Sequence, residues 1–356
     1  MTRSGGLRNF HNLRNGFNVL QVGLVGYGLG GRVFHAPLLV GAGFNLAAIL
    51  TNSPERIDQA RKDFPNARIC SEMDDLLAEK LDLVVISSAN SAHAEQALAA
   101  IGAGVTTVID KPVGRDLPET KAIFSAAESA GVKISAFFNR RWDSETLTLK
   151  RIIRERSLGA IHRFESRFER YKPEIASYGW RDQSDHASGG GWLLDIQTHL
   201  VAGALDLFGP AEVGFAAMRN IRGASDDDVV IVLHHLMGVD SYLTASAVSG
   251  YIGPRMRLSA RGGTVIIDEL DPQEDMLKAG EIPLGGKWSR PTATQVRLHR
   301  GSNTEFEELL GENGSYVDFY LHVHRAITED APMPVSAKDA LEVARLIDIA
   351  REISLR

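Results

Sequence analysis

The stretch that decides the fold spans residues 22–37 and reads VGLVGYGLGGRVFHAP. A short apolar run enters a glycine-rich turn in which Gly26, Gly28 and Gly31 stand at G-x-G-x-x-G spacing, with Gly30 inside the same turn. A buried strand, such a turn and a following helix are typical of a dinucleotide-binding fold. The glycines permit the tight turn, close approach of a pyrophosphate to the backbone, and close packing of helix on strand. Because the helix N-terminus offers unpaired N–H groups to phosphates, we expect a dinucleotide to bind here.

The composition is that of an ordinary globular protein with room for two domains. The chain has 356 residues, 44% hydrophobic and 24% charged, with a formal net charge of -6. This charge and the lack of a basic stripe argue against a nucleic-acid partner, and no apolar run is long enough to suggest a membrane span. Residues 1–18 lack the apolar centre of a secretory signal and are expected to be a flexible extension. Cys70 is the only cysteine, so the sequence predicts no disulfide, no cysteine-based metal site and a cytoplasmic location.

Residues 19–141 are predicted to form a Rossmann domain. Short apolar runs alternate with helical patterns, which indicates a parallel sheet with helices on both faces. Ligands of such sheets bind at the carboxyl ends of the strands. The expected strands are 20–25, 46–51, 83–88, 105–109 and 133–138, and the expected helices are 30–41, 54–64, 91–103 and 117–130.

Residues 142–356 are predicted to form an α+β domain with a large, mostly antiparallel, open-faced sheet. Strand-like segments follow one another here without intervening helices. They are 160–171, 212–221, 228–236, 241–248, 255–260 and 264–268, with helices expected at 143–156, 191–208, 316–329 and 336–353. Because few helices remain to cover both faces, we expect an uncovered apolar face that binds a protein partner.

The end of the second expected strand bears on which cofactor is used. An acidic residue there would bind the ribose 2′-hydroxyl of NAD. This chain has Thr51, Asn52 and Ser53, and then Arg56, a set that suits a 2′-phosphate and therefore NADP. Glu55 leaves NAD open, because a small shift of the loop would present its carboxylate. The serine and the proline after it are equally a helix start, and both interpretations hold together.

Two further motifs carry groups that can move a proton. The fifth strand ends in Asp110 and Lys111, so the lysine points toward the cofactor edge, although a lysine at a strand exit is often only a surface residue. After a glycine run, Asp195 and His199 stand four residues apart and share one face of a helix. A carboxylate beside an imidazole fixes its tautomer and stabilises the imidazolium. This set suits the removal of a proton from an alcohol.

Together these motifs resemble the Gfo/Idh/MocA family of nicotinamide-dependent oxidoreductases over nearly everything after residue 19. The glycine turn, an Asp-Lys-Pro in place of Glu-Lys-Pro, and the Asp-x-x-x-His element all match. The family's Thr-Pro-x-x-x-His segment corresponds to residues 88–93, SANSAH, which lacks the proline. The segments 34–37, 139–143 and 270–275 are similar to the branch that contains NADP-dependent scyllo-inositol dehydrogenase.

The resemblance implies roles for individual residues. Ser88, Asn90 and His93 would lie near the nicotinamide ribose, with Asp110 and Lys111 at the same edge. His199 would be the general base, Lys111 would bind the substrate oxygen, and Asp195 would orient the histidine or a neighbouring hydroxyl. The candidate residues of the substrate cleft are Asn139, Arg141, Trp142, Trp180, Arg181, Asp182, His186 and Trp192.

The sequence therefore predicts an oxidoreductase that transfers a hydride between NADP, or less favourably NAD, and a secondary alcohol of a cyclic polyol or sugar, scyllo-inositol first. No metal is expected. A keto-sugar or anhydrosugar as substrate is an open alternative, and a regulatory dinucleotide binder without turnover is a further one. The resemblance also implies homodimers or homotetramers formed through the second sheet.

Overall fold

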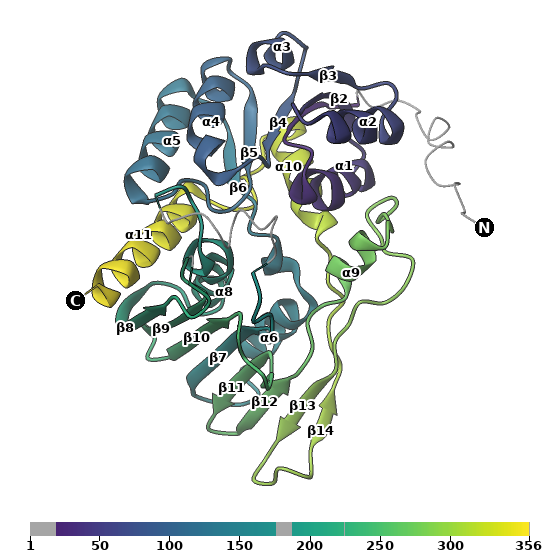
Figure 1. Cartoon of the computed structure of the whole chain (residues 1–356). Helices are drawn as coiled ribbons and strands as arrows, with labels where there is room; N and C mark the ends of the chain where they lie inside the picture. The colour runs from purple at the N-terminus through teal and green to yellow at the C-terminus, as the bar shows by residue number, and fades with distance from the viewer. Residues whose placement is uncertain (1–18, 176–186, 224, 356) are drawn as a thin grey trace.

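The computed structural model describes residues 19–175, 187–223 and 225–355, so the extension expected at residues 1–18 lies outside them. Two sheets organise this chain, one above the other in Figure 1. The first is a six-stranded parallel sheet in the order β3-β2-β1-β4-β5-β6. Its strands are β1 (Gln21–Val25), β2 (Asn45–Leu50), β3 (Arg68–Cys70), β4 (Leu83–Ile86), β5 (Thr106–Ile109) and β6 (Ile134–Ala136).

Helices connect these parallel strands, as the alternating pattern predicts. They are α1 (Ala36–Gly41), α2 (Pro54–Asp63), α3 (Met73–Leu77), α4 (His93–Gly102) and α5 (Leu117–Ala130), with a π-helical turn η2 (Gly30–His35) before α1 and a 3-10 turn η3 (Asn90–Ala92) before α4. The strand order reverses at β1, which pairs with β2 on one side and β4 on the other. A crevice opens at such a switch point at the carboxyl ends of the strands, and the glycine turn lies there.

The second sheet has eight strands in the order β14-β13-β12-β11-β7-β10-β9-β8. All its pairs are antiparallel except β7 with β10, so the expected mostly antiparallel sheet is confirmed. Its strands are β7 (Ile161–Glu169), β8 (Ala211–Arg219), β9 (Asp228–His235), β10 (Asp240–Ser246), β11 (Met256–Ala260), β12 (Gly263–Ile267), β13 (Val296–His299) and β14 (Glu307–Leu309).

The helical elements of this second part are α6 (Ser144–Glu155), α8 (Thr198–Phe208), α9 (Gln273–Lys278), α10 (Val317–Thr328) and α11 (Ala337–Ser354), with a 3-10 turn η4 (Asn139–Trp142) before α6 and a π-helical turn η5 (Leu193–Gln197) before α8. The sequence patterns missed β3, α3, α9, β13 and β14. Each has only three to six residues, too few to display a period of either strand or helix.

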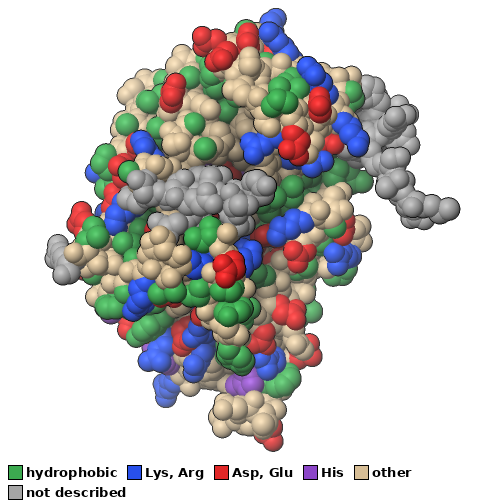
Figure 2. Space-filling view, in the orientation of Figure 1, with side chains coloured by type: hydrophobic (Ala, Val, Ile, Leu, Met, Phe, Trp, Pro, Cys, Tyr) green, Lys and Arg blue, Asp and Glu red, His purple; other side chains and the backbone are tan. Residues whose placement is uncertain are grey.

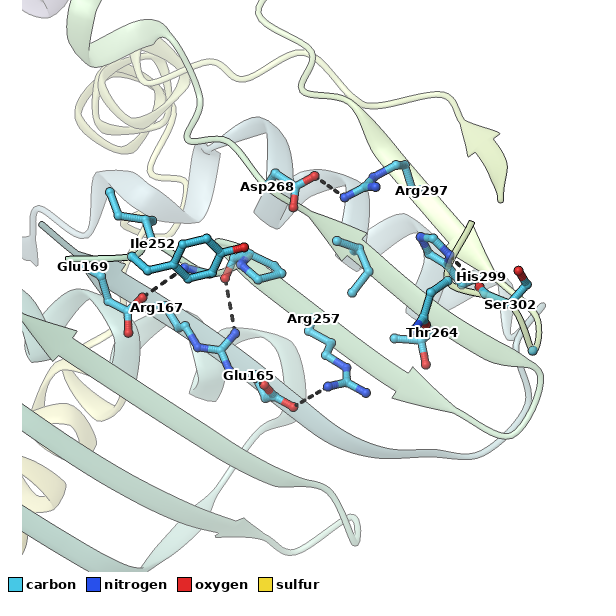
Figure 3. Close-up of a pocket in the computed structure, with 16 residues that line it drawn as sticks. Glu165, Arg167, Glu169, Ile252, Arg257, Thr264, Asp268, Arg297, His299 and Ser302 are labelled. Carbon is cyan, nitrogen blue, oxygen red and sulfur yellow. Dashed lines mark hydrogen bonds and ion pairs between the residues drawn. The ribbon is translucent and has the colours of Figure 1, made fainter. Parts of the chain in front are cut away.

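The two faces of the second sheet differ in character, and strand β7 shows why. Phe164 and Phe168 are buried, whereas Glu165, Arg167 and Glu169 line a broad hollow of about 1280 Å³ on the other face. Figure 3 shows this hollow crossed by ion pairs, among them Arg257 with Glu165 at 3.5 Å. The expectation that the open face is apolar is therefore wrong, because charged side chains share it. The hollow is lined by charged and apolar residues together, because alternate residues of these strands are Arg, Glu and Asp.

The last two helices run back to the first sheet. In Figure 1, α10 lies beside the first sheet and α11 reaches from α5 to β8. Tyr320 of α10 packs with its ring centroid 5.8 Å from that of Phe137 and 6.2 Å from that of Phe44. The division at residues 141 and 142 therefore separates the two sheets in sequence, while the end of the chain joins them in space.

Charges of both signs are interspersed over the face seen in Figure 2. Within the part of the chain that the structure describes, no helix is long and apolar enough to cross a membrane.

Candidate active site

The glycine turn is a cradle that side chains would fill. Gly26 has φ +94°, and a Cβ there would lie 2.5 Å from the carbonyl oxygen of Ser87. A Cβ on Gly31 would lie 2.0 Å from the carbonyl oxygen of Gly26, and one on Gly30 would lie 2.4 Å from Ser87 Oγ. Gly28 differs, because its nearest neighbour is the guanidinium of an arginine side chain at 3.6 Å. Three glycines thus serve close packing, and the backbone of Gly28 is left open to a ligand, which fits a bound dinucleotide.

The guanidinium beside Gly28 belongs to Arg56, on the first turn of α2. Two of the residues expected to discriminate NADP from NAD differ in exposure. Thr51 is buried and donates its backbone N–H to the carbonyl oxygen of Cys70, whereas Asn52 is exposed. Ser53 precedes α2, as the helix-start interpretation predicts, but its side chain makes no capping hydrogen bond. Arg56 and the exposed amide are therefore the groups placed for contact with a ribose substituent.

The segment after β4 connects the first sheet to the second. Asn90 Nδ2 donates to the carbonyl oxygen of Gly189, 2.7 Å away. His93 Nδ1 lies 2.8 Å from the carbonyl oxygen of Pro112, and both side chains are buried. Ser88 Oγ donates to the side chain of Gln96. Asn90 and His93 therefore hold the loops around the proposed nicotinamide position, although the segment lacks the family's proline.

Asp110 and Lys111 lie at the carboxyl end of β5, as expected. Asp110 Oδ1 accepts a hydrogen bond from the backbone N–H of Lys111 at 2.8 Å, and its Oδ2 lies 3.4 Å from Nε2 of the buried His35. Burial alone would raise the pKa of the Asp110 carboxyl, but His35 and the charge of Lys111 outweigh it and hold that pKa below its usual range. The peptide bond from Lys111 to Pro112 is cis. A fixed negative charge therefore lies next to the lysine.

Lys111 is paired with Asp195 across the two sheets. Lys111 Nζ lies 2.5 Å from Asp195 Oδ1 and also donates to the backbone carbonyl oxygen of Asp195 at 2.7 Å. We expected Asp195 to orient His199 or a neighbouring hydroxyl. The structure instead places the Asp195 carboxylate on Lys111, because the lysine at the end of β5 reaches η5 from the other sheet.

His199 is held in its neutral form. Its Nδ1 is buried and has no hydrogen-bond partner among the described residues. Burial lowers the pKa of His199 well below its usual value, and the positive charges of Lys111 and Arg140 lower it further. A neutral imidazole near pH 7 can accept a proton, as a general base must.

These groups meet around a cavity of about 180 Å³ next to the glycine turn. The lining combines charged, polar and aromatic side chains from both sheets. Its members are Leu29, Gly30, Phe34, Asp110, Lys111, Phe137, Asn139, Arg140, Phe168, Arg170, Asp195, Ile196, His199 and Glu274. Lys111, Asp195, His199 and Asn139 are thus brought together, as the sequence predicts.

Three of the expected cleft residues that the structure describes lie elsewhere. Arg141 points away from the cavity and pairs with Asp339 of α11 at 2.9 Å. The ring of Trp142 packs edge-on against Phe319, with centroids 5.6 Å apart. Trp192 is buried in the hydrophobic core, and the remaining candidates, Trp180, Arg181, Asp182 and His186, lie outside the described residues. Arg140, its neighbour in η4, lines the cavity instead of Arg141.

Arg140 is held by a buried ionic network that the sequence patterns did not reveal. Its guanidinium lies 2.7 Å from Glu274 and 3.3 Å from Asp143, which is fully buried. Asp143 also accepts a hydrogen bond from the hydroxyl of Tyr316. Burial, with the charge of Asp143, raises the pKa of nearby Asp271 to about 7. In the sequence the network is present only as the segments 139–143 and 270–275, whose resemblance to one branch of the family does not show which residues contact one another.

Comparison with known proteins agrees with the fold. The family model described as "Oxidoreductase family, NAD-binding Rossmann fold" matches residues 20–138, and "Oxidoreductase family, C-terminal alpha/beta domain" matches residues 150–354. The chain is 31% identical over 350 residues to the scyllo-inositol 2-dehydrogenase (NADP(+)) IolW of Bacillus subtilis, covering 96% of this chain and 95% of that protein. It is 33% identical to the uncharacterised oxidoreductase YdgJ of Escherichia coli, covering 94% and 96%. The structure of the Yersinia pestis oxidoreductase YPO2259 superposes with a TM-score of 0.84 at 35% identity, covering 95% of each chain.

The fold and the glycine cradle thus define a nicotinamide-dinucleotide-dependent dehydrogenase. The chain belongs to the Gfo/Idh/MocA oxidoreductase family, with both of its domains matched. Among the residues that the structure describes, no group of three or more His, Cys, Asp or Glu side chains is placed to hold a metal ion.

Proposed function

We propose that this dehydrogenase oxidises a secondary alcohol of a cyclic polyol or sugar, or reduces the corresponding ketone, with NADP preferred over NAD. The observation that carries the proposal is the convergence of Lys111, Asp195 and His199 on one cavity beside the glycine turn. When bound, the nicotinamide supplies hydride acceptance and donation. The protein residues supply position, charge and proton transfer.

The roles follow from the contacts. The Lys111 ammonium has one strong partner in Asp195 and lines the cavity, so it can donate a further hydrogen bond to the substrate oxygen. Negative charge that develops on that oxygen is stabilised by the ammonium. The neutral imidazole of His199 then accepts the hydroxyl proton. Asp195 is a positioning residue that fixes the lysine. The loop residues Ser88, Asn90 and His93 and the glycines are assigned to cofactor binding.

The preference for NADP rests on Arg56. Its guanidinium lies over Gly28, beside the backbone that would hold the pyrophosphate. A guanidinium there binds a 2′-phosphate through charge-assisted hydrogen bonds. Glu55 accepts a hydrogen bond from the side chain of Gln59 at 3.3 Å and has no basic partner among the described residues. Its carboxylate is therefore available to a ribose hydroxyl, which keeps NAD as the alternative cofactor.

The substrate class is supported by the cavity and by the relative that acts on scyllo-inositol. Three carboxylates and three cations line the space, so its charge is balanced and suits a neutral ring with many hydroxyls. A panel of scyllo-inositol, myo-inositol, aldoses, lactate and ethanol, assayed with NADP and NAD by the absorbance of the reduced cofactor, tests the proposal. We expect the inositols to be the best substrates, and lactate or ethanol as the best substrate contradicts it.

Two alternatives remain under the same fold. A keto-sugar or anhydrosugar as substrate would show in the same panel run in the direction of reduction. A dinucleotide-dependent regulatory binder would bind NADP and show no turnover with any member of the panel. The proton-transfer set in the cavity favours an enzyme, because a binder without turnover has no use for it.

We also propose that the chain is cytoplasmic and assembles as a homodimer or homotetramer through the open face of its second sheet. Ion pairs and exposed apolar side chains share that face, and Tyr251 and Ile252 are both exposed where they line the hollow. Interfaces combine aromatic side chains with arginine in this way. Light scattering should report a particle of at least twice the 38.8 kDa of one chain. A monomer at micromolar concentration contradicts this assembly.

A further inference from the structure

One cation in the cavity is not used by the proposed chemistry. Arg170 directly follows β7, and its backbone N–H donates to the carbonyl oxygen of Ser246 at 2.8 Å, which extends the pairing of β7 with β10. Its side chain lines the cavity with that of Phe168, two residues before it and so on the same face of the strand. The guanidinium carbon of Arg170 lies 4.8 Å from the centroid of the Phe168 ring. The backbone pairing and the ring therefore hold this cation at the cavity wall.

Two of the three cations in the lining are paired with carboxylates, and the third is not. Lys111 is paired with Asp195, and Arg140 with Glu274 and Asp143. The guanidinium of Arg170 has no hydrogen bond or ion pair with another described residue, and its contact is the ring of Phe168. A guanidinium carries five N–H donors in a planar fork and no acceptor. Contact with an aromatic face leaves the donors at the edge of the fork available to a ligand.

We propose that Arg170 is a specificity-determining residue that donates two N–H groups to the oxygens of adjacent hydroxyls on the substrate ring, away from the carbon that faces Lys111 and His199. This rests on the proposed function and adds that the substrate must carry a vicinal diol at its far side. Phe168 contributes the apolar surface beside that diol. Two parallel N–H groups match two neighbouring oxygens, which a lysine ammonium cannot reproduce.

The cavity's own charges favour a neutral diol over an anion. Asp110, Asp195 and Glu274 line the same space. The pKa values of Asp110 and Glu274 are held below their usual ranges, Asp110 by His35 and Glu274 by Arg140, so both carboxyls are ionised near pH 7. Because these carboxylates balance the three cations of the lining, a substrate carboxylate or phosphate would lose its hydration in a confined site without a net positive charge to compensate. Hydroxyl oxygens accept hydrogen bonds from Arg170 without that cost.

The test compares two rings in the native enzyme with NADP. One is scyllo-inositol, which has a hydroxyl on every carbon. The other is a cyclohexanetriol with hydroxyls on alternate carbons, which offers the same reacting alcohol and no adjacent pair. We expect Arg170→Gln to lower kcat/KM for scyllo-inositol by ~10- to 100-fold, the scale of lost hydrogen bonds to a charged group, through a raised KM. Activity on the triol and the KM for NADP should change less than about threefold, the level of a lost neutral contact.

The matched control is Arg163→Gln. Arg163 is on the same strand, lies over a ring in the same way (5.5 Å from the centroid of Tyr242), and points to the opposite face of the sheet. It should leave both substrates unchanged. Calorimetric binding of scyllo-inositol to the enzyme with NADP bound gives a second measure that is independent of turnover, and light scattering checks the assembly of both variants.

The outcomes separate the inference from the proposed function. If Arg170→Gln reduces activity on both rings equally, or on neither, the diol assignment falls while the polyol dehydrogenase stands. If a hexuronate is preferred over its parent aldose and Arg170→Gln abolishes that preference, the residue binds a carboxylate and the assignment is again overturned. If the native enzyme neither oxidises nor binds any polyol, the proposed function fails and the inference fails with it.

Discussion

Lys111 Nζ lies 2.5 Å from Asp195 Oδ1, although 84 residues separate the two in the chain. The contact joins the carboxyl end of β5 in the first sheet to η5, which precedes α8 and lies in the chain between β7 and β8 of the second sheet. Because the lysine also donates to the backbone carbonyl oxygen of Asp195, its ammonium is fixed at two points. The geometry of the proposed catalytic residues therefore depends on how the two sheets are docked.

Replacing Lys111 should reduce turnover more than replacing Asp195. Lys111→Ala removes the donor to the substrate oxygen and should lower kcat by at least ~100-fold. Asp195→Asn keeps an oxygen near the lysine but loses the charge, so a smaller loss of about 10-fold is expected. Steady-state kinetics with scyllo-inositol and NADP provide the measurement. Lys133→Ala is the control, because Lys133 makes a similar 2.5 Å pair with Asp330 away from the cavity. A larger effect of Asp195→Asn than of Lys111→Ala would assign the proton transfer to the aspartate.

The pH profile should report the depressed pKa of His199. Burial and the charges of Lys111 and Arg140 keep the imidazole neutral at pH values where a free histidine is already protonated. The acid limb of kcat/KM for alcohol oxidation should therefore lie below pH ~6.5, the usual histidine value. His199→Asn should lower activity by ~100-fold or more and remove that limb, while NADP binding measured by fluorescence persists. An acid limb at or above the usual value would show that another group titrates.

The choice of cofactor should depend on Arg56. Arg56→Ala should lower kcat/KM with NADP by ~10- to 100-fold, because a charge-assisted contact with the 2′-phosphate is lost, and leave NAD nearly unchanged. Arg61→Ala on the same helix is the control, because Arg61 is exposed and its ion pair with Asp58 is long, at 3.9 Å. If the native enzyme prefers NAD, Glu55 or another acidic residue binds the ribose hydroxyls, and the role proposed for Arg56 is wrong.

The buried carboxyl of Asp271 should make stability depend on pH. Burial and the charge of Asp143 raise its pKa to about 7 in the folded protein, against about 3.9 for an unperturbed aspartate. Because the folded state binds the proton more tightly, this contribution to the free energy of unfolding is complete below pH ~4 and is lost as the pH rises toward 7. Asp271→Asn should remove that loss, so the variant should gain in thermal midpoint relative to the native protein between pH 5 and pH 8. An equal pH dependence in both proteins would contradict the raised pKa.

The elements that the sequence predicted well are those with a strong period or a strict backbone need. Strands β1 and β2 and helices such as α5 and α11 each carry enough residues to show their pattern. The short elements β3 and β14 have three residues each and show none. Within the site, Lys111, Asp195 and His199 were found because they stand at fixed places in motifs. Arg140 was missed in favour of Arg141, because their identical chemistry hides which one η4 turns into the cavity.

The sequence by itself determined the glycine cradle, because Gly26 must adopt a positive φ and Gly31 must approach a carbonyl more closely than any side chain permits. It also determined the alternation of buried and less buried side chains along β9, since side chains alternate along a strand. Only the tertiary structure decided that Asp195 binds Lys111 and not His199, that Arg140 is held by a buried acidic network, and that Arg170 stands at the cavity unpaired among the described residues. These are contacts between segments far apart in the chain, and their distances are set by the docking of two sheets, which no local pattern of residues encodes.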